Sequence, residues 1–372
     1  MQRNRRINVL KEPEKELFER ALDTLKKKVG SNVNYNVISE HEKSLHFSRR
    51  TEQDNYIYEE EYSKAIRLKD KLVQQFKGRT LEEVIPGCII SNEHGECYCI
   101  TNESDTRLVR ASYDKSREVI LSDLKLLSGV GPVWEKKLKQ QGFQTIEDLT
   151  RHPLWRESAI EILRMVDTRE VENLQSTLGR RLPKSHPLAH YLAGFCRTED
   201  FAIIDIETMG LFGRPIILLG IAKQHGDNMR INQFLLRDIS DEASALWELI
   251  NHLDKNSAFI TFNGRAFDIP YIQERLAFYG IRSSLNNPHF DALHFTRRAY
   301  RNRLANCRLE TVEKHYGVNR EVDVPGALIP EFYESYLRTQ NVGPLIAIVE
   351  HNKQDLITLA NIFSKLYNEW NL

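Results

Sequence analysis

The stretch Phe201-Ala-Ile-Ile-Asp205-Ile-Glu207-Thr208 is the segment from which the fold of this chain is best predicted. Its apolar residues predict a buried strand, and on a strand with a period of two residues Asp205 and Glu207 project from the same face. Two like charges beside buried aliphatic side chains repel each other and lose solvation. Two interpretations remain open: a bound cation, or a strand end whose carboxylates reach water or cap the next element.

The residues from 197 to the end predict one α/β domain that contains this strand. The apolar runs that follow predict three further strands, and the first three strands would form a β-meander. Helices are expected after the third strand, after the fourth strand and near the end of the chain. The expected strands cover residues 201–208, 216–222, 231–236 and 258–263, and the expected helices cover residues 240–254, 270–280 and 344–368.

Two later segments of this domain carry further carboxylates. Asp268 follows Phe262-Asn-Gly-Arg-Ala-Phe, where a buried strand ends and a helix begins, and side chains converge on a site at such positions in α/β folds. His351 and Asp355 lie on one face of the last helix. Each segment alone has an ordinary explanation: a helix N-terminal charge worth about 0.3–1 kcal/mol for Asp268, and a surface pair for His351 and Asp355.

Together the three segments are more specific. The pattern Asp-x-Glu on the first strand, Asn263-x3-Phe267-Asp268-x-Pro after a later strand and His351-x3-Asp355 on the last helix resembles the three exonuclease motifs of the DEDD superfamily. That superfamily has an RNase H-like (DnaQ-like) fold with a mixed sheet, and the resemblance covers residues 197–372. Segments between the motifs look like the YprB-type branch, the group that includes a bacterial mitomycin-repair exonuclease; they are residues 290–294, 309–317, 320–326 and 329–333.

The resemblance implies a 3′→5′ exonuclease that hydrolyses DNA phosphodiester bonds by a two-metal mechanism. Asp205, Glu207, Asp268 and Asp355 would bind two ions of Mg²⁺ or Mn²⁺, and His351 would take the proton of the attacking water. Four residues normally separate the His and Asp in the His-type subgroup, and three separate the Tyr and Asp in the Tyr-type subgroup. This chain has a His at the Tyr spacing, so the identity of the base stays open.

Two motif residues and a basic segment point to a polyanionic substrate. Asn263 and Phe267 match positions that lie beside the substrate strand in relatives; Asn263 would donate a hydrogen bond to it, and Phe267 is as readily a core residue. Phe295 and Tyr300 interleave with basic residues, a composition that suits phosphate contact and base stacking. The alternative is a solvated helix whose arginines pair with nearby glutamates. The basic residues are Arg297, Arg298, Arg301, Arg303, Arg308, Lys314 and Arg320.

Residues 122–182 predict a helical unit with a glycine turn. Gly129-Val-Gly131 would form a tight turn between two helices, with Lys136 and Lys137 on the second helix. This resembles a helix-hairpin-helix motif, in which main-chain amides at a helix N-terminus contact the DNA backbone and lysines add affinity. The alternative is an αα-corner that only packs, with Leu127 and Val130 facing inward.

The N-terminal part of the chain is less informative. A helix is expected over residues 11–29, then short β segments at 56–58 and at a hairpin over 88–100, with a helix over about 59–77 between them. These elements predict a small α+β unit. The expected domains are residues 1–121, the helical unit 122–182, a linker 183–196 and the exonuclease domain 197–372.

Composition sets broad limits. The chain has 372 residues, and Lys+Arg and Asp+Glu both number 52, so net charge argues neither for nor against nucleic acid. Five scattered cysteines suit free thiols in a reducing compartment, hence the cytoplasm, and no apolar run approaches the length of a membrane span.

Three functions follow from these observations. The leading one is a DNA exonuclease in DNA repair, acting on single-stranded 3′ ends or on damaged or branched duplex, with a repair helicase as a partner that the resemblance suggests. The alternatives are an RNA-processing exonuclease and a catalytically silent nucleic-acid-binding adaptor. Silent copies of a site tend to lose ligands, whereas Asp205, Glu207, Asp268 and Asp355 are all present.

Overall fold

The computed structural model describes residues 52–370 apart from 212, 319 and 321–323, with side chains from residue 60 onward. The helix predicted over residues 11–29 lies outside the described residues. Among the residues it describes, no helix is both long and apolar enough to cross a lipid bilayer.

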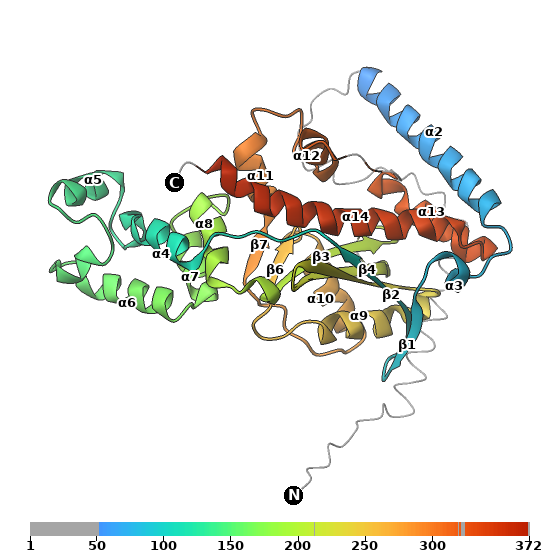
Figure 1. Ribbon diagram of the computed structural model, residues 1–372, viewed down its shortest axis with the longest axis horizontal. Coiled ribbons are helices and arrows are strands. Elements are labelled where there is room, and N and C mark those ends of the chain that lie inside the picture. Colours follow the sequence, from blue (N-terminus) through green and yellow to red (C-terminus); the bar gives the residue numbers. More distant parts are fainter. Residues whose placement is uncertain (1–51, 212, 319, 321–323, 371–372) are drawn as a thin grey trace, which may run out of the picture.

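A seven-stranded mixed sheet forms the centre of the molecule (Figure 1). The strand order is β1-β2-β5-β4-β3-β6-β7. The predicted meander is confirmed, because β3, β4 and β5 pair antiparallel in succession, while β6 and β7 add in parallel on the other side of β3. The strands are β1 (Cys88–Asn92), β2 (Gly95–Ser104), β3 (Phe201–Thr208), β4 (Ile216–His225), β5 (Asn228–Leu235), β6 (Ala258–Thr261) and β7 (His289–Asp291).

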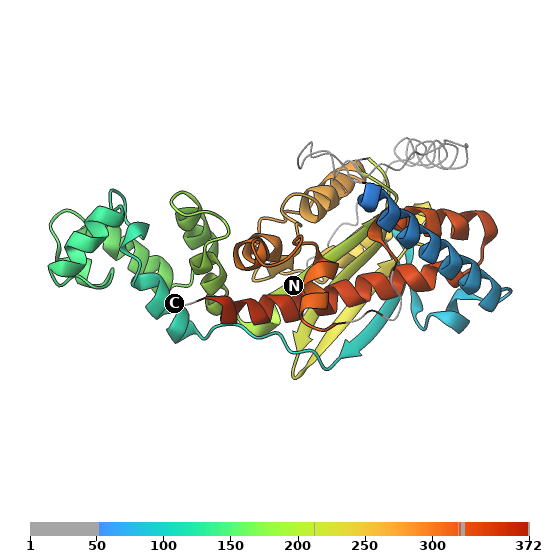
Figure 2. The same ribbon diagram turned by 90° about the horizontal axis from the view of Figure 1, so that it is seen from above.

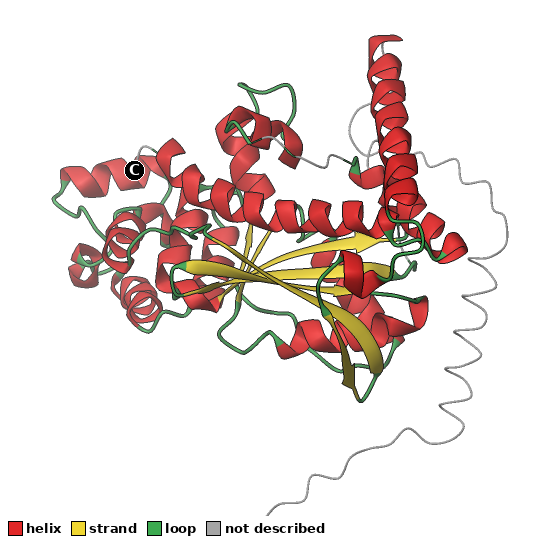
Figure 3. Ribbon diagram, turned by 45° about the vertical axis from the view of Figure 1, so that its right-hand side comes forward, coloured by secondary structure: helices red, strands yellow, loops and turns green. Residues whose placement is uncertain are grey.

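Helices cover both faces of the sheet (Figure 3). The long helix α14 (Gly343–Lys365) crosses one face and contacts β3, β4, β5 and β6, while α9 (Glu242–Asn251) and α10 (Asp268–Phe278) lie on the other. Alternate residues of β3 divide accordingly: Phe201 and Ile203 pack in one core cluster with the C-terminal half of α14, whereas Ile204 and Ile206 pack in the other. Asp205 and Glu207 follow the parity of Phe201, so they face α14.

The N-terminal hairpin is part of this sheet. β1 and β2 pair with each other across the predicted turn, and β2 then pairs with β5, so the hairpin extends the C-terminal sheet. The prediction of β structure at Tyr56–Tyr58 was wrong, because these residues lie in α2 (Glu52–Gln75). A run of three aromatic and β-branched residues is too short to outweigh the helix-forming Glu, Lys, Arg and Leu residues around it. Helix α2 packs against α14.

The helical unit lies at one end of the sheet (Figure 2). It contains α4 (Tyr113–Leu121), α5 (Pro132–Gln140), α6 (Arg156–Asp167) and α7 (Val171–Gly179). A 3₁₀ turn, Leu124–Leu126, stands where the sequence predicted the first helix before the glycine turn. The predicted linker also differs from a free tether, because it holds α8 (Pro187–Tyr191), in which His190 is fully buried between the rings of Phe295 and Tyr367.

The structure also describes four further α-helices. They are α3 (Leu81–Val84), α11 (Ala292–Tyr300), α12 (Leu309–His315) and α13 (Ile329–Thr339). Predicted helix 270–280 begins two residues earlier, at Asp268, and the predicted helix 344–368 begins at Gly343 and ends at Lys365. The first strand has the predicted bounds.

Candidate active site

Strand β3 presents Asp205 and Glu207 toward α14, as the period of two predicted. Asp205 is half-buried and Glu207 is 8% exposed. The pairing of β3 with β4 shifts register between Glu207 and Thr208, which marks a β-bulge. Bulges commonly redirect side chains next to active sites. This one lies at the C-terminal end of β3, beside Glu207.

Asp205 is positioned by Asn352 of α14, which lies over a row of three paired residues in the sheet. Asp205 pairs with Gly220 of β4, and Gly220 pairs with Gln233 of β5, so all three lie on one face. The amide of Asn352 on α14 lies over Gly220: its Nδ2 donates to Asp205 Oδ2 over 2.8 Å, and its Oδ1 accepts from Gln233 Nε2 over 2.9 Å. Asn352 is fully buried. Sequence reasoning missed this residue, although a glycine inside an apolar strand is a signal of close approach.

Gly220→Ala is expected to displace Asn352 and so disturb Asp205. A Cβ atom at position 220 would lie 2.2 Å from Asn352 Oδ1 and 2.9 Å from its Cγ, and the amide is held on both sides. Overpacking of this kind costs about 1–3 kcal/mol. Urea unfolding should show this loss.

A double-mutant cycle with Asn352→Ala provides the control for Gly220→Ala. If the clash with the amide is the cause, the loss caused by Gly220→Ala should shrink in the Asn352→Ala background, because contacting residues are coupled. Equal losses in both backgrounds would show that the strain lies elsewhere.

Asp268 is placed by the loop between β6 and α10. It is the first residue of α10 and is 5% exposed. The loop is clamped by Asp291, whose Oδ1 accepts from the backbone N–H of Asn263 over 2.8 Å and whose Oδ2 accepts from that of Arg265 over 3.1 Å. Asn263 has a left-handed φ of 69°, which asparagine tolerates better than most residues. Asp291 therefore positions the Asp268 loop, a role that sequence reasoning did not assign.

Helix α14 brings His351 and Asp355 to the same place. His351 Nε2 lies 3.5 Å from Asp355 Oδ2 and 3.9 Å from Glu207 Oε1. His351 is 6% exposed, so the pair is not the surface pair of the ordinary explanation. The structure thus brings together the four carboxylates and His351 of the three sequence motifs.

The three carboxylates of β3 and α10 are hard to ionise in this environment. Burial, followed by repulsion from Asp355 and the other carboxylates, raises the pKa of Asp205 and of Glu207 well above the ordinary range. Burial also raises the pKa of Asp268 to about 7, with repulsion from Asp291 and Asp355 adding to it. A cation placed among these groups would reverse this effect, because opposite charge favours the ionised form.

Arg320 is part of the site and not of the basic surface that the sequence suggested. Its side chain is 5% exposed. Nη2 donates to Asp355, Nε donates to Glu313 Oε2 over 2.7 Å, and Nη1 lies 3.1 Å from His351 Nδ1. Although burial opposes the charge, Asp355 and Glu313 raise the pKa of this guanidinium.

The Arg320 contact assigns the tautomer of His351. A guanidinium can only donate, so Nδ1 accepts and the neutral ring carries its proton on Nε2. In this arrangement His351 has no free lone pair with which to take a proton from water.

The side chains of this site have the ligand atoms that a hard divalent cation prefers. Four carboxylates supply only oxygen ligands, which Mg²⁺ and Mn²⁺ prefer. Among residues 52–370 that the structure describes, however, no three His, Cys, Asp or Glu side chains are gathered closely enough to hold an ion as they stand. Mutual repulsion opposes a closer approach of these carboxylates, and Asp355 already has a cationic partner in Arg320.

Some of the residues predicted to contact nucleic acid are exposed, and others are buried. Arg297 and Arg298, in the last turn of α11, and Arg301, which follows that helix, are exposed. The prediction that Phe295 and Tyr300 are available for base stacking was wrong, because they are 2% and 0% exposed and belong to the core. An amphipathic helix buries its aromatic face, and composition alone does not tell which face that is.

Phe267 lies next to Asp268, as the motif required, and its ring packs 5.3 Å from that of Tyr271. Phe267 is half-buried, so it is partly a core residue. Arg303 forms the kind of ion pair that the alternative interpretation expected, with Glu369 at 2.6 Å.

A cavity of about 390 Å³ lies between the helical unit and the sheet. Gln175 of α7 bridges the two parts through both backbone groups of His289 on β7. Because Asp291 lines this cavity and also binds the loop that carries Asp268, the cavity lies beside the carboxylate cluster. Its basic side chains are Lys184 and Arg265; His289 and His294 also line it, but burial lowers the pKa of both, that of His289 to about 3.

The glycine turn has part of the predicted geometry. Gly129 has a φ of 80°, and Gly131 is the residue before α5. Leu127 and Val130 are buried, as predicted. Lys136 and Lys137 are exposed on α5, and Lys137 lies over the ring of Trp134.

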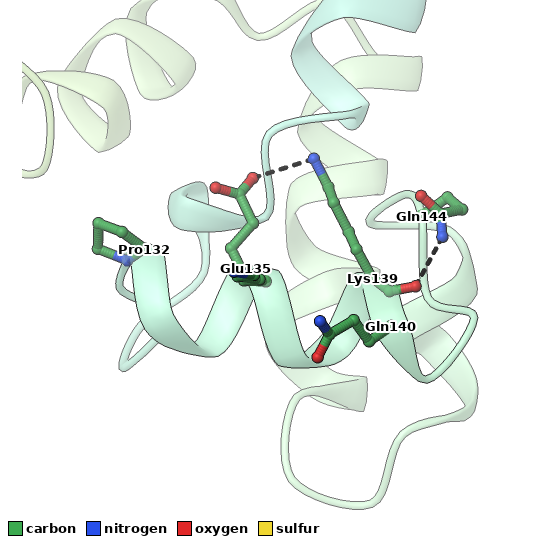
Figure 4. Close-up of a pocket in the computed structure, with 6 residues that line it drawn as sticks. Pro132, Glu135, Lys139, Gln140 and Gln144 are labelled. Carbon is green, nitrogen blue, oxygen red and sulfur yellow. Dashed lines mark hydrogen bonds and ion pairs between the residues drawn. The ribbon is translucent and has the colours of Figure 1, made fainter.

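A shallow pocket of about 560 Å³ lies along α5 and is lined by Pro132, Glu135, Lys136, Lys139, Gln140 and Gln144 (Figure 4). Lys139 lies there against Glu135, with 3.2 Å between Nζ and Oε1, so its charge is compensated. The structure gives no ion pair to Lys136 or Lys137 within its described residues, which leaves these two charges to face solvent.

The comparisons with known proteins fit this architecture. The family model of the RNase_H superfamily matches residues 202–367. The chain is also 32% identical over 186 residues to the uncharacterized protein YprB of Bacillus subtilis (strain 168), and the match covers 47% of this chain and 44% of that protein. The chain thus spans less than half the length of this relative. Together with the mixed sheet, the family match confirms the predicted RNase H-like domain.

Proposed function

We propose that this protein is a divalent-metal-dependent nuclease, specifically a 3′→5′ exonuclease that hydrolyses DNA. The observation that carries the proposal is the convergence of Asp205, Glu207, Asp268 and Asp355 on one largely buried site of an RNase H-like domain. The energetic cost of burying these mutually repelling groups makes sense if they bind cations. Two ions of Mg²⁺ or Mn²⁺ would activate the attacking water and stabilise the leaving oxygen.

The protein's own residues hold and orient this site. Asn352 fixes the orientation of the Asp205 carboxylate, and Asp291 fixes the loop that carries Asp268. His351 is the proposed proton acceptor, since its Nε2 lies 3.9 Å from Glu207 and 3.5 Å from Asp355. That role requires Nδ1 of His351 to be released from Arg320.

DNA is the proposed substrate because two separate basic regions accompany the site. One is the cavity beside Asp268 with Lys184 and Arg265, and the other is α5 with Lys136 and Lys137. Both regions offer phosphate contacts that are independent of sequence, and the first lies beside Asp268. The assignment to DNA repair in the cytoplasm, beside a helicase, rests on the resemblance and the free cysteines alone.

The activity is tested by digestion of end-labelled single-stranded, nicked and double-stranded DNA and of matched RNA. Each substrate is incubated with Mg²⁺, Mn²⁺ or a chelator, and labels at the 3′ and 5′ ends report polarity. The proposal expects metal-dependent shortening from the 3′ end of DNA. Shortening of RNA alone would indicate RNA processing, and binding without hydrolysis would indicate a silent adaptor.

The double variant Lys136→Ala/Lys137→Ala should weaken DNA binding mainly at low salt. Each phosphate contact adds about 0.9 to the slope of log affinity against log salt, so the slope on duplex DNA should fall by about 2. Fluorescence anisotropy with labelled duplex DNA and duplex RNA measures it. The matched control is Lys255→Ala, an exposed lysine between α9 and β6.

An unchanged slope in the double variant would remove α5 from the DNA interface. Equal affinity of the native protein for RNA and DNA duplexes would count against DNA as the preferred substrate. Neither result depends on catalysis.

A further inference from the structure

Arg320 places a fixed positive charge inside the carboxylate cluster. The guanidinium is bound on three sides, by Asp355, by His351 Nδ1 at 3.1 Å and by Glu313 at 2.7 Å. With 5% exposure it is shielded from water, and a buried charge acts on its neighbours more strongly than a surface one. Arg320 therefore competes with any other cation that approaches Asp355.

The other carboxylates lack such a partner. Among the described residues, no ion pair involves Asp205 or Asp268, whereas Asp355 pairs with Arg320 and Glu207 lies 3.9 Å from His351. Asp355 is consequently turned toward Arg320. The cluster therefore contains the oxygen ligands that a divalent ion prefers, but among the described residues they are not close enough together to hold an ion. Beside the ring of His351, the group that holds Asp355 in this arrangement is a cation of the protein itself, the Arg320 guanidinium.

We propose that Arg320 acts as an internal cation that is displaced from Asp355 when Mg²⁺ or Mn²⁺ binds. The inference rests on the proposed function, because it takes the four carboxylates as metal ligands. A guanidinium and a divalent ion repel each other at ligand distance, so both cannot be held by the same Asp355 oxygen.

Glu313 gives the displaced side chain a second anchor. Arg320 Nε bonds to Glu313 Oε2 independently of Asp355, and Thr358 donates to the other oxygen of Glu313. The guanidinium therefore keeps one partner when it leaves Asp355. The same movement releases Nδ1 of His351, so Arg320 is a positioning residue that makes the lone pair of His351 depend on metal binding.

Isothermal titration of Mg²⁺ and Mn²⁺ into the full chain tests this role without any need for activity. Arg320→Gln removes the competing charge and should bind either ion about 10- to 100-fold more tightly than the native protein, the change expected for one charge-assisted hydrogen bond. Arg320→Lys, which keeps the charge, should fall between the two. Arg303→Ala is the matched control, because it breaks an arginine–glutamate pair outside the site.

The outcomes separate the two proposals. If the native protein binds metal and Arg320→Gln binds it with the same affinity, the inference about Arg320 is overturned and the metal site stands. If neither protein binds metal, the proposed function fails and the inference fails with it.

A measurement on the native protein covers the case in which Arg320→Gln does not fold. The ring nitrogens of His351 are observed by ¹⁵N NMR and assigned by their loss in His351→Gln. Nδ1 should show the shift of a hydrogen-bonded acceptor without metal and should lose it at saturating Mg²⁺. An Nδ1 shift that is unchanged at saturation overturns the displacement of Arg320.

Discussion

Asp205→Asn is expected to reduce divalent-dependent hydrolysis of DNA by about 10³-fold or more. A metal ion contributes several kcal/mol to the stabilisation of transition-state charge, and about 4 kcal/mol corresponds to this factor. The asparagine keeps an oxygen that can accept from Asn352, so the local structure should persist. Single-turnover digestion of end-labelled DNA with Mg²⁺ or Mn²⁺ measures the rate.

The fold of Asp205→Asn should be intact or more stable when metal is absent. Burial and the neighbouring carboxylates oppose the charge of Asp205, so a neutral side chain removes repulsion. Thermal unfolding in chelator checks this. The matched control is Asp227→Asn, since Asp227 is 91% exposed in the turn between β4 and β5. Full activity of Asp205→Asn would refute the proposed site.

Arg275→Ala is expected to lower the free energy of unfolding by about 3–5 kcal/mol, the usual cost of leaving one charge of a buried pair without its partner. Arg275 and Glu242 are 3% and 0% exposed in their side chains and form two hydrogen bonds of 2.8 and 2.6 Å. Glu242 also accepts from Tyr279 and from the backbone N–H of Ile216. Guanidinium chloride unfolding of the full chain measures the loss.

This pair joins α9 to α10, the helix that begins at Asp268, so its loss should also affect the active site indirectly. Lys115→Ala is the control, because the Lys115–Glu118 pair is exposed and should contribute no more than about 1 kcal/mol. An equally small effect of Arg275→Ala would mean that its neighbours repack or that water reaches Glu242.

The sequence predicted those parts of the fold that local pattern determines. The meander follows from three apolar runs, and the orientation of Asp205 and Glu207 follows from the period of a strand. Strand β7 was missed because its three residues, His289–Asp291, are too few to show a pattern. The addition of the hairpin to the sheet was missed because pairing between β2 and β5 is not visible in either strand alone.

The candidate site was likewise predicted only in part from the sequence. The resemblance to known motifs supplied Asp268, His351 and Asp355, and the structure brings them to Asp205 and Glu207. Their supports were not predictable, because they act across the fold: Asn352 bonds to a residue 147 positions away. Arg320 was interpreted as one of several surface arginines, since charge counting along a sequence does not distinguish a buried guanidinium from an exposed one.

The hairpin β1–β2 has a consequence for the synthesis of this protein. Thr101 of β2 bonds to Asn232 of β5, 131 positions later, so the ribosome must complete the whole helical unit before the two strands can meet. During that interval β2 has an open edge, and open edges are sites of aggregation. Closing so long a loop also slows folding. Formation of α4 to α7 before β5 is synthesised would shorten the loop that pairing of β2 with β5 has to close.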